Sequence, residues 1–427
     1  MAVEPIITEG SAATEIEQQL EDEPARAAQR SEPVGFAALA AMTNVAQGIL
    51  TLARRRALAP NLEKTPRRYT LTEVAELVQI PRKTLEYAIQ TKDLPKGDAS
   101  ARKRLFTLKD VEAFRRYAGT LPWRAPGTRP AIITVANFKG GVGKTSAAVH
   151  LVQYFARRGY RTLAIDLDPQ ASLTTLFGLL PDTDIPDEAT ALPYLRGELD
   201  SLRPAVRKTH WHGLDLIPAN LALSDAEFSL ANRQGRETGF VFYRPLLAGL
   251  EKLAPDYDII VIDTPPAQGF TTMNALFAAT ALLVPLTPAM MDFASVSLFL
   301  RMLTANLEVL NKYEGVEKTF DFVRVLLSKF ESNNKVHQQI ERWVRKGFPG
   351  NVLAKNLALS AALRTGPDMQ TAYEVSSESE RRTLDRRTLR RAIEFLDDVN
   401  EEIEALVREQ WLPDDSAVPL VRGASRA

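Results

Sequence analysis

The sequence predicts an α/β fold, a mostly parallel sheet with helices on both faces, preceded by a small, α-rich winged helix-turn-helix segment. After residue 130, continuous apolar runs alternate with helical periodicity, which is typical of a parallel sheet covered on both faces. Residues 66–119 carry a different pattern of helix, tight turn, helix, basic turn and helix. Residues 120–130 separate the two patterns and contain three prolines and a glycine, so a linker is predicted there.

Composition excludes several classes of protein. The 427 residues are 45% hydrophobic and 25% charged, as in a globular chain of two or three domains. Lys plus Arg and Asp plus Glu are equal at 53 each, so any nucleic-acid surface must be local. There is no cysteine, which excludes disulfides, thiolate metal sites and iron–sulfur clusters. The apolar run 273–286 is too short to span a bilayer and the acidic N-terminus lacks a signal pattern, so we expect a cytoplasmic protein without membrane association.

Before the winged segment, the chain predicts a leader and one helix. Residues 1–35 are rich in Glu, Ala, Gln and Pro, which favours a flexible acidic leader. Residues 36–60 have apolar side chains at helical spacing and end in three arginines, which suit a helix C-terminus. This helix either pairs with a second chain, as a dimerisation element, or packs on its own domain.

Within residues 66–119 we expect three helices. The first runs from Thr72 to Val78 with Thr70 or Thr72 as its cap, and the second runs from Arg82 to Thr91. A basic hairpin over 95–105 and a third helix follow. In this motif, the N-terminal end of the second helix usually faces base edges. The basic side chains of the hairpin would contact phosphates. The alternative is a small protein-binding helical domain with a solvated basic turn. The candidate DNA-binding residues are Arg82, Lys83, Thr84, Arg102, Lys103 and Arg104.

The α/β domain is predicted over residues 131–410. Its expected strands are 131–137, 160–168, 258–266, 279–287 and 321–330. A helix over 145–159 follows the first strand, a charged helical stretch covers 378–410, and a polar tail covers 411–427.

The stretch "NFKGGVGKTS", residues 137–146, resembles a phosphate-binding loop with one departure. The usual pattern Gly-x-x-x-x-Gly-Lys-Ser/Thr has Phe138 in place of its first glycine, and an extra lysine, Lys139, precedes Lys144. Glycines let backbone N–H groups approach phosphates, and the following helix adds its positive N-terminal end. Lys144 is expected to reach the β- and γ-phosphates and the Thr145 hydroxyl to bind Mg²⁺. The alternative, a glycine-rich turn with chance lysines, is disfavoured by the strand before it and the helix after it. The predicted nucleotide-binding residues are Lys139, Gly140, Gly141, Val142, Gly143, Lys144, Thr145 and Ser146.

Carboxylates follow two of the predicted strands. Asp166 and Asp168 end one strand and Asp263 ends another, at the edge where ligands sit in such sheets. Because Asp166 and Asp168 are two residues apart, we expect both to point to the same face of the strand. We assign Asp166 and Asp263 to the Mg²⁺ shell with Thr145, and Asp168 to the attacking water, which it would orient or deprotonate.

Three motifs resemble those of a known family. "KGGVGKTS" (139–146), "DLDPQAS" (166–172) and "DYDIIVIDTPP" (256–266) look like the deviant Walker A, A′ and Walker B motifs of the ParA/MinD ATPases. The resemblance covers about residues 66–410 and is closest to the larger, DNA-binding ParA proteins. Residues 371–407 resemble the C-terminal segment of the RepA partition ATPases of repABC plasmids. Ser146 stands where many relatives have a second threonine.

The resemblance implies a function and its partners. A P-loop ATPase of this family binds ATP and Mg²⁺, forms an ATP-sandwich homodimer, and hydrolyses ATP to ADP weakly until a ParB-type partner stimulates it. Lys139 would reach the partner subunit's nucleotide and belong, with Lys144 and Asp168, to the catalytic residues. The alternative is a surface lysine beside the loop. The family moves plasmid or chromosome DNA on the nucleoid, and the winged segment, similar to MerR-like domains, favours operator binding and autorepression.

Nonspecific DNA binding is predicted from a second basic cluster. Arg382, Arg386 and Arg390 line one stripe of the C-terminal helical stretch, and ParA relatives bind DNA through basic C-terminal surfaces. The alternative is a solvated face, partly neutralised by the acidic residues just beyond.

Two other functions use the same nucleotide switch. A MinD-like positioning ATPase would need a C-terminal amphipathic anchor, which residues 411–427 do not supply. A transcriptional regulator with a vestigial nucleotide fold is disfavoured by the intact set Lys144, Thr145, Asp168 and Asp263.

Overall fold

The computed structural model describes residues 35–58, 64–98, 104–122, 124–315, 317–359, 370–375 and 386–412. The chain divides into two units, the first comprising Met1–Thr65 with Thr365–Gln370 and the second comprising Pro66–Arg364 with Thr371–Ala427. In the first unit, α2 (Phe36–Leu58) confirms the helix expected over 36–60. Its pairing with a second chain stays a prediction, and the leader and the tail beyond residue 412 lie outside the described residues.

Short, well-capped elements form the segment 66–119. They are β1 (Tyr69–Thr70), α3 (Leu71–Val78), α4 (Arg82–Thr91), β2 (Leu105–Phe106) and α5 (Leu108–Ala118). Thr70 caps α3 and Thr107 caps α5, each in a reciprocal pair with the acidic residue three positions on. β1 pairs antiparallel with β2, and the expected hairpin is present as a bridge between Asp98 and Leu105. The tip of that hairpin, 99–103, lies outside the described residues.

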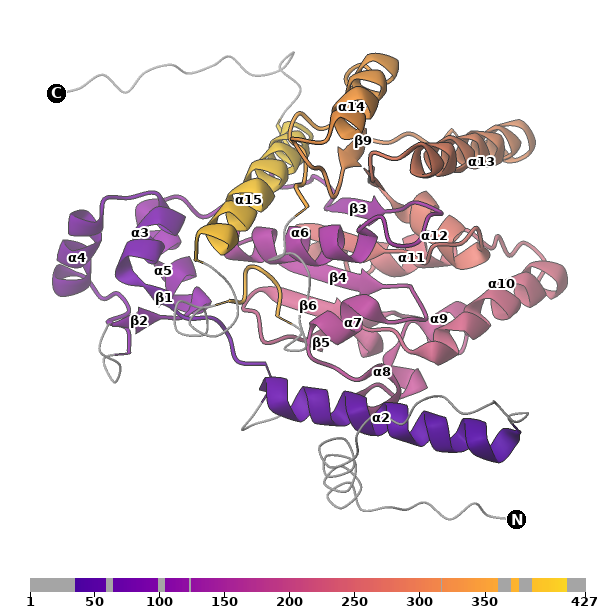
Figure 1. Ribbon diagram of the computed structural model, residues 1–427, viewed down its shortest axis with the longest axis horizontal. Helices are drawn as coiled ribbons and strands as arrows, with labels where there is room; N and C mark the ends of the chain where they lie inside the picture. The colour runs from indigo at the N-terminus through magenta and orange to yellow at the C-terminus, as the bar shows by residue number, and fades with distance from the viewer. Residues whose placement is uncertain are drawn as a thin grey trace. The chain divides into compact units, whose positions relative to one another are not determined.

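A seven-stranded sheet forms the centre of the second unit, in the order β5-β6-β4-β7-β3-β8-β9 (Figure 1). Its strands are β3 (Ala131–Val135), β4 (Thr162–Asp166), β5 (Arg207–Lys208), β6 (Leu214–Ile217), β7 (Ile259–Asp263), β8 (Ala281–Leu286) and β9 (Phe322–Leu327). All neighbours are parallel except β5 and β6. The five predicted strands are confirmed, and β5 and β6 were not predicted.

The helices of this unit are α6 (Lys144–Arg158), α7 (Ser172–Leu176), α8 (Pro181–Asp184), α9 (Leu192–Arg196), α10 (Asp225–Arg236), α11 (Pro245–Glu251), α12 (Phe270–Ala278), α13 (Met290–Glu314), α14 (Lys335–Gly347) and α15 (Arg386–Glu409). Short 3₁₀ turns lie at Asp187–Ala189, Arg203–Ala205, Leu221–Ser224 and Ala254–Asp256.

Successive residues of the strands enter different cores, because side chains alternate across a sheet. Ile132 of β3 packs in a cluster with α9 and α11, whereas the next residue, Ile133, packs in a cluster with α6 and α15. A third cluster lies under α13 and α14. Helices therefore cover both faces of a mostly parallel sheet, and the predicted α/β class is confirmed. The assignment of residues 66–119 as a winged helix-turn-helix stays a prediction.

The segment 66–119 does not have a core of its own. Tyr69 and Phe114 belong to the same cluster of buried residues as Phe155 of α6 and Leu396 of α15. Arg67 adds a polar contact, since its Nη1 donates a hydrogen bond to the carbonyl of Tyr373 at 3.2 Å. The proline-rich connection 120–130 therefore joins two parts that share one hydrophobic core.

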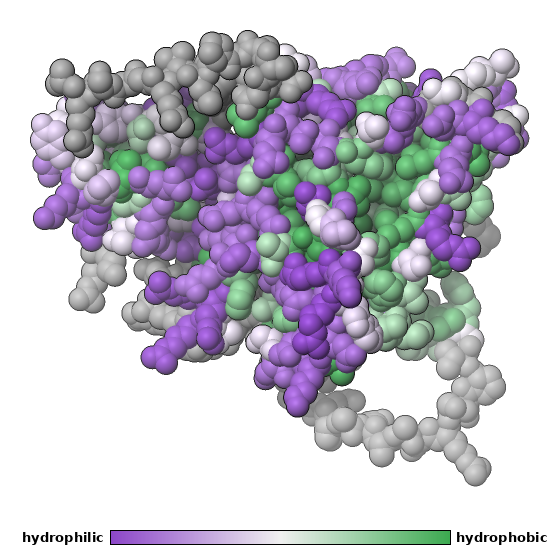
Figure 2. All heavy atoms as spheres, turned by 90° about the horizontal axis from the view of Figure 1, so that it is seen from above, coloured by the Kyte–Doolittle hydropathy of each residue, from purple (hydrophilic) through white to green (hydrophobic). Residues whose placement is uncertain are grey.

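Helix α13 is unusually apolar for a partly exposed helix. Among the helices of the described residues, α13 is the one that is long and apolar enough, over Met290–Lys312, to cross a membrane. In its most apolar part, 28% of the residues are buried in the protein. Core helices of soluble proteins pass the same test, so this is weak support for a membrane span. Apolar side chains gather on the face seen from above, where α13 and α14 lie (Figure 2). The exposed large apolar side chains of α13 include Met290, Met291 and Leu298, and those of α14 are Val336 and Trp343.

Candidate functional site: a phosphate-binding loop

The glycine loop connects β3 to α6, and its conformation needs glycine at two positions. Gly141 and Gly143 have φ angles of 75° and 92°, in the region that side chains disfavour. A Cβ added at Gly140 or Gly141 would meet no atom within 4 Å, so this side of the loop is open. Lys144, the first residue of α6, is buried, and its Nζ donates a hydrogen bond to the Lys139 carbonyl at 3.2 Å. The open backbone and the lysine held over it are the arrangement that a phosphate requires.

Lys139 itself is exposed, and its neighbour anchors the loop. Asn137 is buried, its side-chain oxygen accepts a hydrogen bond from the Lys139 N–H at 3.1 Å, and its amide donates to the Pro285 carbonyl of β8 at 2.7 Å. Ser295 of α13 also donates to Asn137, at 3.3 Å. The loop is thus fixed at its base while the Lys139 side chain faces outward.

The end of β9 holds the middle of the loop. Ser328 donates a hydrogen bond to the Val142 carbonyl at 2.7 Å, and Lys329 donates to the Gly141 carbonyl. Lys329 has a φ of 51°, which is uncommon for a residue with a long side chain. No sequence pattern predicts these two contacts, because the residues that make them lie 186 and 188 positions apart along the chain.

The two carboxylates predicted to hold Mg²⁺ lie side by side but differ in their partners. Asp166 and Asp263 are register neighbours on β4 and β7. The Asp166 oxygens accept hydrogen bonds from the Asp168 N–H and from the N–H and hydroxyl of Thr174, at 3.1, 2.9 and 2.8 Å. Both Asp263 oxygens are buried and have no hydrogen-bond partner of good geometry among the residues that the structure describes. Of the pair, Asp263 therefore has the lone pairs that a cation or its bound water could use.

The pKa shifts of Asp263 and Lys144 also favour a cation at the loop. Burial raises the pKa of Asp263 well above its ordinary value, and the adjacent Asp166 raises it further, whereas Thr145 and Lys144 lower it. Burial lowers the pKa of Lys144, while the charges of Asp263 and Asp168 raise it. A divalent cation at this point would stabilise the charged form of both carboxylates. The donor set thus fits Mg²⁺, which usually takes one or two carboxylates together with phosphate oxygens.

Asp168 lies beyond the strand. Because β4 ends at Asp166, the expectation that both carboxylates occupy one face of the strand was wrong. Asp168 is only 9% exposed, and its Oδ1 accepts a hydrogen bond from the Gln170 N–H at 3.0 Å. Its charge still acts on Lys144, so it faces the same loop.

The predicted DNA-binding residues are only partly described. Arg82 pairs with Glu86 at 2.9 Å and donates to the Thr72 hydroxyl at 3.2 Å, which orients it at the start of α4. Lys83, Thr84 and Arg104 are exposed. Arg102, Lys103 and Arg382 lie outside the described residues, and so does the side chain of Arg386. Arg390 is exposed and pairs with Glu394 at 3.1 Å.

Comparison with known proteins decides the family. An "AAA domain" family matches residues 130–324. A putative replication protein A from Rhizobium rhizogenes is 37% identical over 368 residues, which are 82% of this chain and 89% of that protein. The chain belongs to the ParA/MinD family of ATPases. The protein SopA of Escherichia coli strain K12 is 32% identical, over 83% of this ParA/MinD chain and 92% of SopA.

Solved structures show the fold that this ParA/MinD protein shares. A structure described as "Partition Protein" has a TM-score of 0.61 and 24% identity, and the match covers 87% of this chain and 98% of that chain. The Cyanothece McdA(D38A)–ATP complex has a TM-score of 0.53 and 20% identity, over 65% of this chain and 98% of that one. Both support the fold alone.

Proposed function

We propose that this protein is a partition ATPase that uses ATP and Mg²⁺ to segregate plasmid or chromosome DNA. One observation carries the nucleotide chemistry: the buried Asp263 carboxylate, which has no hydrogen-bond partner of good geometry among the described residues, lies close to Lys144 at the end of a glycine loop. The likeness to a protein named as a putative replication protein favours DNA segregation over another use of ATP. Hydrolysis of ATP to ADP and phosphate is weak in the free protein and rises with a ParB-type partner.

Each residue of the site has a role in this proposal. The backbone N–H groups of residues 140–146 and the Lys144 ammonium hold the phosphates, and the Thr145 hydroxyl and Asp263 hold the metal. Bound Mg²⁺ would supply positive charge at the phosphate oxygens. Asp166 accepts hydrogen bonds from the Thr174 N–H, which fixes it, and from the Asp168 N–H, which positions Asp168. Asp166 would therefore bind the metal only through its remaining lone pairs. Asp168 orients the attacking water or accepts its proton.

The proposed homodimer forms around the nucleotides. Lys139 faces outward, so a facing subunit would receive its positive charge at the phosphates, where negative charge develops during hydrolysis. Met290 and Met291, at the start of α13, are 58% and 77% exposed, and the same helix contacts the loop anchor through Ser295. An apolar surface beside the loop is suited to burial against a second copy. Nucleotide binding and dimerisation would then be linked.

DNA would be bound in two ways, and the protein would be cytoplasmic and associated with the nucleoid. The exposed residues at the start of α4 would bind the operator of its own operon, which gives autorepression. The ATP dimer would bind DNA of any sequence through the C-terminal arginines.

Substituting Lys83 tests operator binding without disturbing the shared core. Lys83→Glu is expected to weaken specific operator binding at least tenfold, because it reverses an exposed charge at the helix end that faces DNA. ATP-dependent binding to unrelated DNA should stay within about twofold of the unmodified chain. Lys109→Glu, an exposed lysine on α5, is the matched control. Equal operator affinity for Lys83→Glu and the parent in a footprinting titration would remove α4 from the interface.

Nonspecific DNA binding tests the C-terminal arginines. Replacing Arg382, Arg386 and Arg390 with alanine removes about six phosphate contacts from a dimer, and each contributes about −0.9 to the slope of log affinity against log salt. With ATP and Mg²⁺, the slope should therefore become shallower by up to about 5, while ATP affinity is unchanged. An unchanged slope means that another surface binds the DNA. If the parent chain binds unrelated DNA equally with ATP and ADP, the nucleotide switch is wrong.

A further inference from the structure

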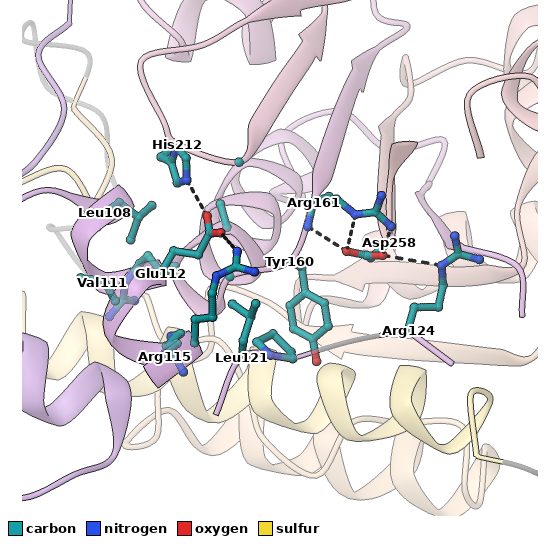
Figure 3. Close-up of a pocket in the computed structure, with 16 residues that line it drawn as sticks. Leu108, Val111, Glu112, Arg115, Leu121, Arg124, Tyr160, Arg161, His212 and Asp258 are labelled. Atoms are coloured by element: carbon teal, nitrogen blue, oxygen red, sulfur yellow. Dashed lines mark hydrogen bonds and ion pairs between the residues drawn. The ribbon is translucent and has the colours of Figure 1, made fainter. Parts of the chain in front are cut away.

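A cavity lies where the segment 66–119 meets the sheet, at the opposite end of α6 from the phosphate loop (Figure 3). Its volume is about 270 Å³, slightly below the usual range of about 300–1,000 Å³ for small-molecule sites. α5, the connection after it, the C-terminal end of α6 and the turns before β6 and β7 line it. The size suits a small ligand.

The lining of the cavity is strongly basic. Five arginines and two carboxylates line it. The carboxylates are already engaged, since Glu112 pairs with Arg116 and His212, each at 2.6 Å, and Asp258 pairs with Arg161 at 2.6 Å. Figure 3 shows these two clusters at either side of the cavity. Arg124 also pairs with Asp258 at 3.6 Å, and Arg157 pairs with Asp397 at 3.1 Å. The buried Nε–H groups of Arg115, Arg124 and Arg157 nevertheless have no hydrogen-bond partner of good geometry among the described residues.

Arg115 is the least satisfied of the three. Arg115 is 2% exposed, and both its Nε and its Nη2 lack a hydrogen-bond partner within the described residues. Burial lowers the pKa of Arg115 to about 10, with a further lowering by the charge of Arg158. The charge of Glu404 raises the pKa of Arg115, but Glu404 already accepts hydrogen bonds from Tyr154 and Tyr160 at 2.7 and 2.8 Å and pairs with Arg158 at 3.1 Å. A buried guanidinium without an anion costs several kcal/mol in general, so an anion here would stabilise the fold.

The backbone makes room for this side chain. Gly159 ends α6 with a φ of 98°, and a Cβ there would lie 2.9 Å from Leu121 and 3.6 Å from the Arg115 Cδ. Three arginines from three separate segments, α5, the connection and α6, thus approach one space. A tetrahedral anion can accept hydrogen bonds from several directions at once, and guanidinium groups match phosphate oxygens well.

We propose that this cavity binds a small anion of phosphate chemistry, held by Arg115, Arg124 and Arg157 between α5 and the end of α6. The ligand is either free inorganic phosphate or the phosphate group of a small metabolite. This site is separate from the nucleotide loop, and it would strengthen the contact between the winged segment and the ATPase core.

Thermal unfolding of the full chain tests the proposal. All proteins carry Lys144→Ala, so that the loop lysine cannot hold the added phosphate, and sodium chloride keeps the ionic strength constant. Phosphate is expected to raise the melting temperature in a saturable way, by about 1.5–2 °C at ten times the half-saturating concentration. Arg115→Met should lose this rise and should melt at or above its parent in phosphate-free buffer, because it removes a buried unpaired charge. Arg203→Met, an arginine outside the cavity that is 62% exposed, is the control that keeps the rise.

Different results would overturn the site. It is wrong if Arg115→Met responds to phosphate like its parent, or if neither protein responds. Should Arg115→Met fail to fold, Arg124→Gln must raise the half-saturating phosphate concentration at least tenfold, and an unchanged value overturns the proposal. If adenosine monophosphate has a lower half-saturating concentration than inorganic phosphate, the ligand is a phosphorylated metabolite. If the two half-saturating concentrations are equal, the ligand is free phosphate. An equal rise with adenosine, which has no phosphate, also contradicts the proposal.

Discussion

Lys144→Ala is expected to abolish detectable ATP binding. Lys144 is buried, and its ammonium donates to the Lys139 carbonyl, the one hydrogen-bond partner that it has in the part of the chain that the structure describes, so a phosphate would take over that contact. Two charge-assisted contacts to phosphates, at about 1.5–3 kcal/mol each, correspond to a loss of about 10²–10⁴-fold in affinity. A fluorescent ATP analogue titrated with Mg²⁺ measures this directly.

The control for this result is the other lysine of the loop. Lys139→Ala should bind ATP within about threefold of the parent, because its side chain faces outward from its own site. It should instead lose dimerisation in ATP, measured by sedimentation. Equal ATP affinity in Lys144→Ala and the parent would contradict the loop assignment, and a large loss of affinity in Lys139→Ala would contradict its action on the partner.

Asp168→Ala is expected to leave ATP binding and dimerisation intact and to lower turnover by about 10²–10⁴-fold, the usual contribution of a general base. The protein should then stay on DNA in ATP. Phosphate release by the parent and by the variant, each with the ParB-type partner, measures the loss.

A second substitution at Asp168 separates chemistry from local folding. The Asp168 carboxylate also accepts a hydrogen bond from the Gln170 N–H, so alanine removes a turn contact as well. Asp168→Asn keeps this contact and removes the charge, and it should be as inactive as the alanine variant. Turnover restored by asparagine would make Asp168 a structural residue, and loss of nucleotide binding would place it on the phosphates.

The sequence predicted the buried strands well and the sheet edge poorly. β3, β7 and β8 are uninterrupted apolar runs, because both of their faces are covered. Asp215 interrupts the apolar run of β6 in the sequence. It can be buried because Tyr257 and Lys208 donate hydrogen bonds to its carboxylate at 2.7 and 2.8 Å. No pattern in the sequence pairs these residues, since Tyr257 lies 42 positions away.

The site residues that belong to one sequence motif could be predicted. The contacts between residues far apart in the sequence could not. The glycines, Lys144 and the strand-ending carboxylates follow from spacing. The difference between Asp166 and Asp263 does not, because it depends on Thr174, eight residues beyond Asp166. The histidines show the same limit: His210 contacts Glu374, 164 residues away, at 2.7 Å.

If segment 66–119 binds an operator as proposed, the core that it shares with α6 restricts how that specificity could change. Swapping the whole segment 66–119 between relatives would leave Phe155, Arg157 and Tyr160 facing a foreign surface. Specificity can instead diverge through exposed positions such as Lys83 and Thr84, which lie away from that core. Chimeras built by exchanging only the exposed face of α4 should therefore keep their melting temperature, whereas whole-segment chimeras should fold only when the end of α6 is exchanged with them.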